Sequence, residues 1–159
     1  MHIPEYPEFA PISWSMQPDL HPRLVLGSDG VSEFTFANLF LFRREYGYTL
    51  SYLKEEDRIV VSGSKDGSRF FLLPCGLPHF KTLARLFEDH DYLKNMPESI
   101  CNEKRIELEK SGFVVQEDRD NFDYLYLRKD LAHLPGRKLH KKRNLVNAFI
   151  NNYDYMETF

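Results

Sequence analysis

Residues 48–73 read YTLSYLKEEDRIVVSGSKDGSRFFLL, and this stretch decides the fold class. It contains three short runs rich in apolar and β-branched residues, at residues 48–53, 59–62 and 70–73. Charged or glycine-containing turns separate these runs, a pattern that is typical of consecutive strands joined by tight connections. The stretch therefore predicts a three-stranded antiparallel meander.

Helical patterns lie on both sides of the predicted meander. Before it, residues 32–46 predict an aromatic-rich helix with Ser32 as its N-cap and Gly47 as its stop. After it, residues 77–90 and 99–110 have the spacing of amphipathic helices. Two strands, a last helix and the start of another strand are expected at residues 113–116, 122–127, 136–151 and 153–159. This order predicts an α+β fold with helices flanking a mainly antiparallel sheet.

The chain is expected to consist of a leader and one domain. Residues 1–30 contain five prolines, so they cannot hold a long helix, and we expect them to run extended over the surface. A chain of 159 residues has the length of one ordinary domain. We therefore assign residues 31–159 to a single domain.

Composition favours a soluble protein of the cytoplasm. The chain has only two cysteines, which are too few for a disulfide framework and favour a reducing compartment. No stretch approaches the roughly 18 apolar residues of a membrane helix, and the start lacks the pattern of a signal peptide. The histidines are scattered without metal-ligand spacing, so we expect no metal site.

Residues 136–144, GRKLHKKRN, carry the densest chemical signal. They hold five of the 21 lysines and arginines and no acid, whereas the other sixteen basic residues are outnumbered by 24 acidic ones. On a helix, Lys138, Lys141 and Lys142 would share a face that can bind phosphate. Cations at a helix start oppose the macrodipole unless an anion compensates them. The alternative is a solvated helix face. The candidate phosphate-binding residues are Arg137, Lys138, Lys141, Lys142, Arg143 and Asn144.

Residues 117–124, EDRDNFDY, form a link dense in carboxylates directly before a predicted strand. One interpretation is a charged turn in which Asp and Asn bond their own backbone and Arg119 pairs with a neighbouring acid. In the other, Asp120 or Asp123 orients cations of the basic helix, so that a site of both signs holds the phosphate and the amine of one substrate. The candidate positioning residues are Asp120, Asn121, Asp123, Tyr124 and Tyr126.

Three motifs together resemble a known family: residues 32–39 (SEFTFANL), 118–126 (DRDNFDYLY) and 136–144. The chain resembles the bacterial DUF2156 proteins, which are similar to the C-terminal domain of phosphatidylglycerol lysyltransferases and, more distantly, to Fem-type aminoacyl-transferases. The resemblance implies a GNAT-like fold built of two units in tandem, of which this chain is the N-terminal half. It also implies transfer of an aminoacyl group from charged tRNA to a lipid or peptidoglycan acceptor.

From this resemblance we expect one half of an aminoacyl- or acyl-transferase-like protein, inactive by itself, whose basic helix docks a tRNA acceptor end or an anionic lipid headgroup. A second hypothesis is a non-catalytic interaction module with a degenerate GNAT-like fold, which pairs with a second GNAT-like unit or forms a homodimer. A third is a stand-alone coenzyme A acetyltransferase. Coenzyme A or acyl-coenzyme A is a possible cofactor under this hypothesis, although the glycine-containing loop that holds its pyrophosphate in GNAT enzymes has only a distant counterpart in residues 134–137.

Overall fold

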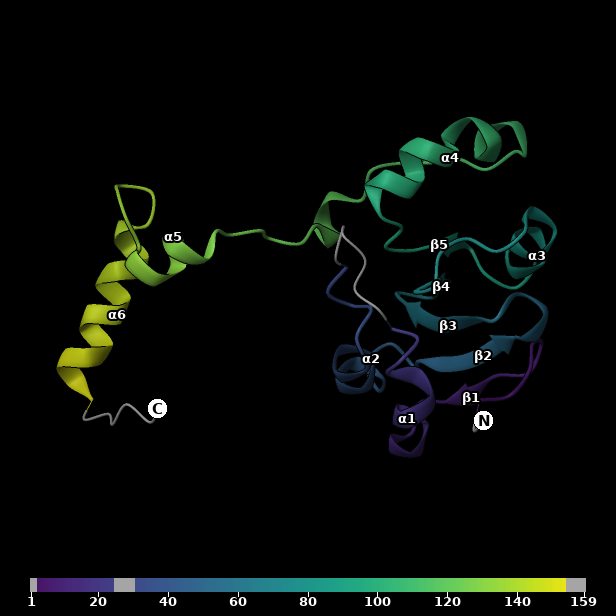
Figure 1. Cartoon of the computed structure of the whole chain (residues 1–159), viewed down its shortest axis with the longest axis horizontal. Coiled ribbons are helices and arrows are strands. Elements are labelled where there is room, and N and C mark those ends of the chain that lie inside the picture. The colour runs from purple at the N-terminus through teal and green to yellow at the C-terminus, as the bar shows by residue number, and fades with distance from the viewer. Residues whose placement is uncertain (1–2, 25–30, 154–159) are drawn as a thin grey trace. The chain divides into compact units, whose positions relative to one another are not determined.

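The computed structural model of the protein describes residues 3–24 and 31–153 (Figure 1). The chain forms two compact units, Met1–Phe122 and Asp123–Phe159. The first unit contains the sheet and most of the helices, and the second contains two helices.

A five-stranded sheet lies at the centre of the first unit, in the order β1-β2-β3-β4-β5. Its strands are β1 (Ala10–Pro11), β2 (Thr49–Leu53), β3 (Arg58–Lys65), β4 (Ser68–Leu72) and β5 (Tyr92–Leu93). Neighbouring strands from β1 to β4 are antiparallel, and β5 pairs with β4 in parallel. The predicted α+β class, mainly antiparallel sheet and meander of β2, β3 and β4 are confirmed. The sequence prediction missed β1 and β5, each only two residues long.

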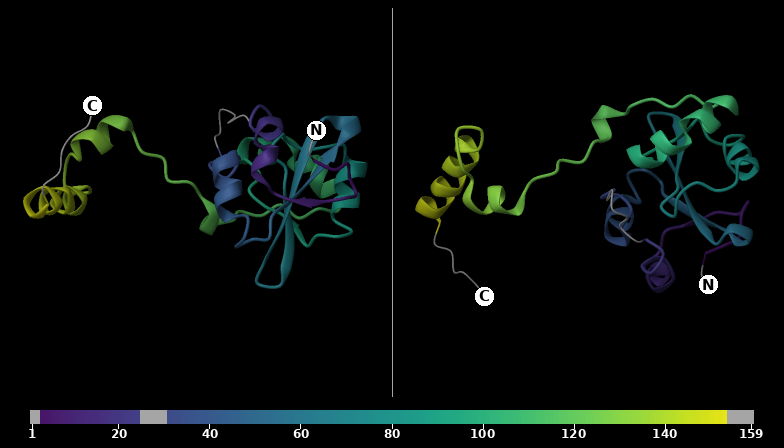
Figure 2. Two further views of the ribbon diagram at one scale, coloured as in Figure 1. Left: turned by 90° about the horizontal axis from the view of Figure 1, so that it is seen from below. Right: turned by 45° about the horizontal axis from the view of Figure 1, so that its top comes forward.

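Helices cover both faces of the sheet (Figure 2). On one face, the core includes side chains of α1 (Gln17–Leu20) and α2 (Phe36–Phe42). On the other, it includes side chains of α3 (Phe80–Leu86) and α4 (Glu98–Lys110). Successive strand residues point to opposite faces, so Ile59 and Val61 belong to the first cluster and Val60 to the second.

The aromatic helix α2 is shorter than predicted. The N-cap is Thr35 and not Ser32, because Thr35 has an extended backbone and its Oγ1 accepts a hydrogen bond from the Asn38 amide at 3.2 Å. Phe36 and Leu39 are buried. After Phe42 the chain continues in turns up to Gly47, whose φ of +60° ends the helical conformation.

Helix α3 begins at Phe80, three residues later than predicted, and a side chain from a different segment caps it. Glu56 lies in η2 (Lys54–Glu56), between β2 and β3. Its carboxylate accepts hydrogen bonds from the His79 amide at 2.7 Å and from the Thr82 hydroxyl at 2.6 Å. Two donors at the helix start are thereby satisfied. Helix α4 agrees with the prediction, although its apolar residue Ile106 is 68% exposed.

The proline-rich leader is largely part of the core. It forms β1, η1 (Trp14–Met16) and α1, so the expected extended conformation is wrong for residues 14–20. Its fully buried apolar side chains pack in the first cluster, whereas the partly buried Tyr6 and Phe9 pack against the second. The buried residues are Ile3, Ile12, Met16, Leu20 and Leu24.

The two strands predicted after α4 are absent from the described residues. Phe113 and Val115 pack against the second core cluster, so their alternation reflects burial and not strand pairing. The first unit ends with η3 (Arg119–Asn121). Residues 122–127 form no strand, since alternation alone provides no partner.

The second unit contains α5 (Arg128–His133) and α6 (His140–Asn152). The prediction missed α5, and α6 begins four residues later than expected. Gly136 has a φ of +69° and Leu134 a φ of +45°, and this left-handed turn cannot continue a right-handed helix. Tyr153 is the C-cap of α6, and the rest of the strand predicted over 153–159 lies outside the described residues.

Across residues 3–24 and 31–153, no helix has both the length and the apolar character needed to cross a membrane.

Candidate phosphate-binding site

The candidate cations gather around the start of α6. Arg137 and Lys138 lie in the turn before the helix, and Lys141 and Lys142 lie in its first turn. All four are exposed, as is Asn144. Arg143 is half-buried, and its Nη1 donates a hydrogen bond to the Leu134 carbonyl oxygen. Arg143 therefore also holds the turn that places the other cations.

The sequence around these cations contains no counter-charge. Residues 131–153 contain no Asp or Glu, and no acid lies in the first turn of α6. None of the five lysines and arginines of the basic run forms an ion pair with another described residue. The N-cap, Leu139, provides no side-chain hydrogen bond. Since cations oppose the helix dipole, this helix start is electrostatically suited to an external anion.

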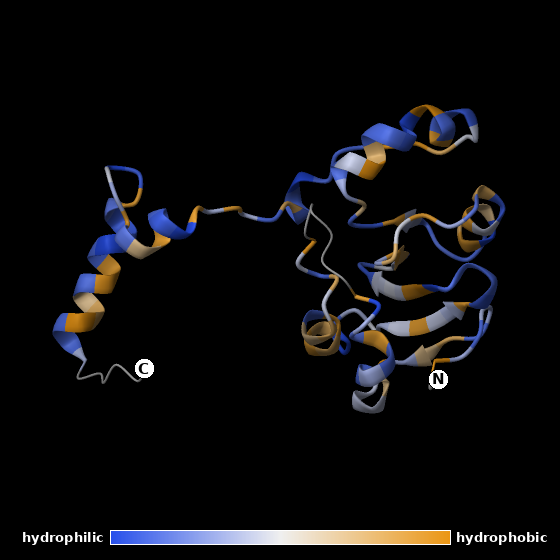
Figure 3. Cartoon of the chain, viewed as in Figure 1, coloured by the Kyte–Doolittle hydropathy of each residue, from blue (hydrophilic) through white to orange (hydrophobic). Residues whose placement is uncertain are grey.

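The other side of α6 is apolar and exposed. Figure 3 shows its hydrophobic residues in orange, between hydrophilic residues in blue. Leu145, Val146, Phe149 and Ile150, at helical spacing, are between 46% and 66% exposed. We call these four residues the apolar side of α6. The helix therefore combines cations at its start with an apolar stripe along its length.

Asp120 and Asn121 belong to the first unit, in η3. The Asn121 side-chain amide donates to an Asp118 carboxylate oxygen at 2.6 Å, and its backbone amide donates to the Asp118 carbonyl. Arg119 lies 3.7 Å from the Glu117 carboxylate. The Arg119–Glu117 contact is the one expected of the charged-turn interpretation. The Asn121 side chain, however, bonds a carboxylate and not its own backbone, and Asp120 is exposed.

Asp123, Tyr124 and Tyr126 belong to the second unit, before α5. The two tyrosine rings stack with centroids 6.4 Å apart, and they are 87% and 52% exposed. This pair offers flat aromatic surface to an outside partner.

Comparison with known families decides what the chain is related to. Residues 26–158 match the family described as phosphatidylglycerol lysyltransferase, C-terminal. The chain belongs to this family. Its match extends over the basic residues 137–144 and the candidate positioning residues alike.

A solved structure resembles this member of the lysyltransferase C-terminal family over most of its length. It is the crystal structure of a conserved protein of unknown function from Bacteroides thetaiotaomicron, with a TM-score of 0.66 and 26% sequence identity. The alignment covers 91% of this chain and 50% of that chain, so this chain spans about half the length of that protein. No relative was found among the curated proteins.

The sequence prediction missed two buried polar residues of the first unit. His90 and Lys94 are 5% and 7% exposed. The available signal was a lysine within the apolar run Tyr92-Leu93-Lys94-Asn95-Met96, which flanks an unrecognised two-residue strand. The described residues contain no cluster of three or more His, Cys, Asp or Glu that could hold a metal ion.

Proposed function

We propose that this chain is one half of an aminoacyl- or acyl-transferase-like protein and that its basic residues 137–144 dock a phosphate-bearing substrate. Membership of the lysyltransferase family supports the transferase part. The observation that carries the docking role is the group of exposed cations at the start of α6, within a run that contains no acid. In such a role the unit holds one substrate in place, and orientation of two substrates contributes much of the rate in group transfer.

We propose further that the parent protein has two GNAT-like units in tandem. Support comes from the length of the related crystal structure, of which this chain covers 50%. The α+β architecture with helices on both faces of a mainly antiparallel sheet is compatible with such a unit.

A phosphate-bearing substrate can be a tRNA acceptor end or an anionic lipid headgroup. The apolar side of α6 favours the lipid, because a basic helix with an exposed apolar stripe binds at the interface of anionic membranes. A tRNA would instead use the cations alone, with base stacking on exposed aromatic rings such as Tyr124.

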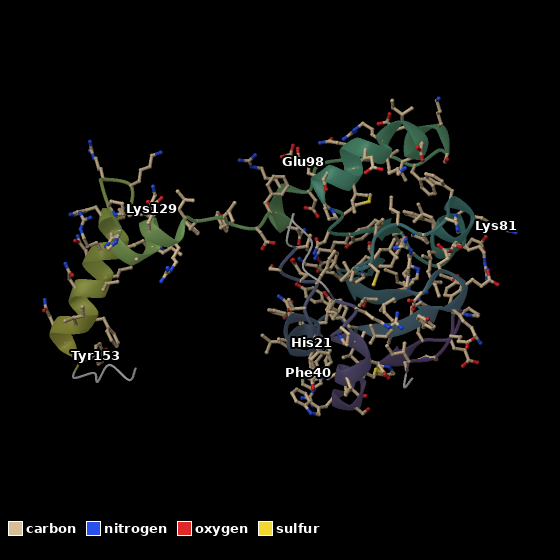
Figure 4. The ribbon with its side chains drawn as sticks, viewed as in Figure 1. His21, Phe40, Lys81, Glu98, Lys129 and Tyr153 are labelled. Atoms are coloured by element: carbon tan, nitrogen blue, oxygen red, sulfur yellow. The ribbon has the colours of Figure 1, made fainter. Side chains whose placement is uncertain are left out.

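The experiment is to measure binding to vesicles containing phosphatidylglycerol, and separately to charged tRNA, as the salt concentration rises. The double variant Lys141→Glu/Lys142→Glu should weaken binding. It should also reduce the slope of log K against log salt concentration by about two if each lysine contacts one phosphate. The matched control is Lys81→Glu on α3, a lysine that Figure 4 shows directed away from the first unit. An unchanged slope in the double variant would reject the docking role.

A second candidate function is a non-catalytic interaction module. The observation in its favour is the exposure of Leu145, Val146 and Ile150 on α6, because contiguous exposed apolar side chains mark protein interfaces. The partner would be a second GNAT-like unit or a second copy of the chain. Analytical ultracentrifugation over a range of concentrations tests the homodimer: the variant Val146→Glu/Ile150→Glu should dissociate it. A wild-type protein that stays monomeric at high concentration would exclude self-association.

A further inference from the structure

Lys94 occupies a position of the sheet where a core residue is expected. It follows β5, and its amide donates to the Phe71 carbonyl at 2.9 Å, which continues the parallel pairing with β4. The residue is only 7% exposed. Its Nζ lies 5.3 Å from the ring centroid of Tyr46 and 5.3 Å from that of Phe70. The ammonium group is therefore held over two aromatic rings.

The charge of Lys94 has no direct counter-ion among the described residues. No carboxylate there lies within 4 Å of its Nζ. Removal from water lowers the pKa of Lys94, and Glu33 and Asp118 act in the opposite direction from beyond ion-pair distance. The ring faces offset part of the desolvation, but a buried ammonium is stabilised fully only by a hydrogen-bonded anion.

The next residue, Asn95, is also incompletely satisfied. Its φ of +59° places the backbone in the left-handed region. Both the nitrogen and the oxygen of its side-chain amide are buried without a hydrogen-bond partner. Buried amides are nearly always paired, so this group is complementary to a polar atom from outside the chain.

Both residues line a cavity of about 10 Å³, which is room for about one water molecule. Leu73, just after β4, and Ile100, on α4, line it as well. The cavity therefore lies beyond the carboxyl ends of the parallel pair β4 and β5, where their chains separate. Many lining residues are half-buried, so it lies directly beneath the surface.

We propose that Lys94 and Asn95 bind one oxygen atom of a carboxylate or phosphate group in this cavity. Lys94 supplies the charge and the Asn95 amide nitrogen a second donor, in surroundings that are otherwise largely apolar. Charge-assisted hydrogen bonds are strengthened in such surroundings. The site belongs to the first unit and does not depend on the basic residues of α6.

The test is the thermal unfolding midpoint of the whole chain in acetate or phosphate, compared with chloride at the same ionic strength. Lys94→Met keeps an apolar side chain of similar length at the buried position, and Asn95→Gly keeps the positive φ, so both variants should fold. Lys81→Met, on the exposed face of α3, is the matched control. An NMR signal from the isotope-labelled lysine Cε, identified by its loss in Lys94→Met, reports on the same site directly.

We expect the anion to raise the unfolding midpoints of the wild type and of Lys81→Met by the same amount. Lys94→Met should weaken the apparent affinity by about tenfold or more, and Asn95→Gly by less. A response to acetate alone identifies a carboxylate, and a response to phosphate alone identifies a phosphate group. The proposal is overturned if neither anion shifts the wild type, or if Lys94→Met responds as the wild type does; a full response in Asn95→Gly would remove Asn95 from the site.

Discussion

The Ser62 hydroxyl donates a hydrogen bond to Nε2 of His90 across 2.8 Å. The direction is fixed because Nδ1 of His90 lies 2.7 Å from the Leu86 carbonyl oxygen, which can only accept. Nδ1 therefore carries the proton, and the neutral ring accepts at Nε2. Both residues are buried, so this pair joins β3 to the segment after α3 inside the core.

This pair predicts a loss of stability in mild acid. Burial lowers the pKa of His90 below its ordinary 6.5, so the unfolded chain takes up this proton at a higher pH than the folded protein. The contribution is complete above about pH 6.5 and is lost as the pH falls through the folded-state pKa. The free energy of unfolding, measured in urea between pH 5 and 7.5, should depend less steeply on pH in His90→Gln than in the wild type. His21→Gln, at an exposed position, should show the same pH dependence as the wild type. Equal slopes in wild type and His90→Gln would contradict the assignment.

Removal of the Ser62 hydroxyl should destabilise the fold even at neutral pH. Ser62→Ala leaves Nε2 of His90 buried without a donor, which costs about 1–3 kcal/mol. The free energy of unfolding from urea titrations measures the effect, and Ser64→Ala, on the exposed end of the same strand, is the control.

Gly63 is required by the packing of two rings. A Cβ at this position would lie 2.8 Å from the Phe70 ring and 2.9 Å from the Tyr48 ring. Both side chains are buried, so neither can withdraw into solvent. Gly63→Ala should therefore destabilise the first unit by about 1–3 kcal/mol, measured as a lower free energy of unfolding. A neutral effect would mean that the two rings can move apart.

The capping of α3 by Glu56 can be tested in the same way. Glu56→Ala removes the acceptor for His79 and Thr82 and should cost about 0.5–2 kcal/mol. Glu55→Ala, the exposed neighbour, provides the comparison. Identical unfolding midpoints of the two variants would show that water replaces the cap.

Coenzyme A is expected to leave the thermal midpoint unchanged. The turn formed by residues 134–137 is only a distant counterpart of a pyrophosphate-binding loop. A specific ligand raises the midpoint by mass action, so thermal-shift measurements with coenzyme A and acetyl-coenzyme A are decisive. A saturable rise would favour the acetyltransferase hypothesis over both functions proposed above.

The sequence predicted those elements whose signal is local. The strands β2, β3 and β4 each contain an apolar run, and short turns connect them. Each strand therefore pairs with the next one in the sequence, so the sequence pattern also predicts the pairing. The partner of β5 lies some twenty residues earlier along the chain, and the strand itself consists only of Tyr92 and Leu93, so no local pattern marks it. The alternation at Phe113 and Val115 was misread because burial against helices produces the same pattern as burial in a sheet.

The candidate site was predictable to the extent that charge is visible in composition. A run of cations without acids can be recognised whatever its conformation, and the structure places it around a helix start. The turn at Gly136 was not foreseen, because a positive φ depends on the tertiary setting as well as on the residue. The burial of Lys94 was not predicted, because a lysine beside apolar residues is a weak local signal and its burial is a property of the packed sheet.

The shortness of β1 and β5 limits how copies of this protein can associate. These two strands form the outer borders of the sheet, and each is only two residues long. Long, flat borders are what allow sheets of separate molecules to join and grow into fibrils. The short edge strands therefore disfavour aggregation of the first unit through backbone pairing, and its association with other copies is expected to use side-chain contacts.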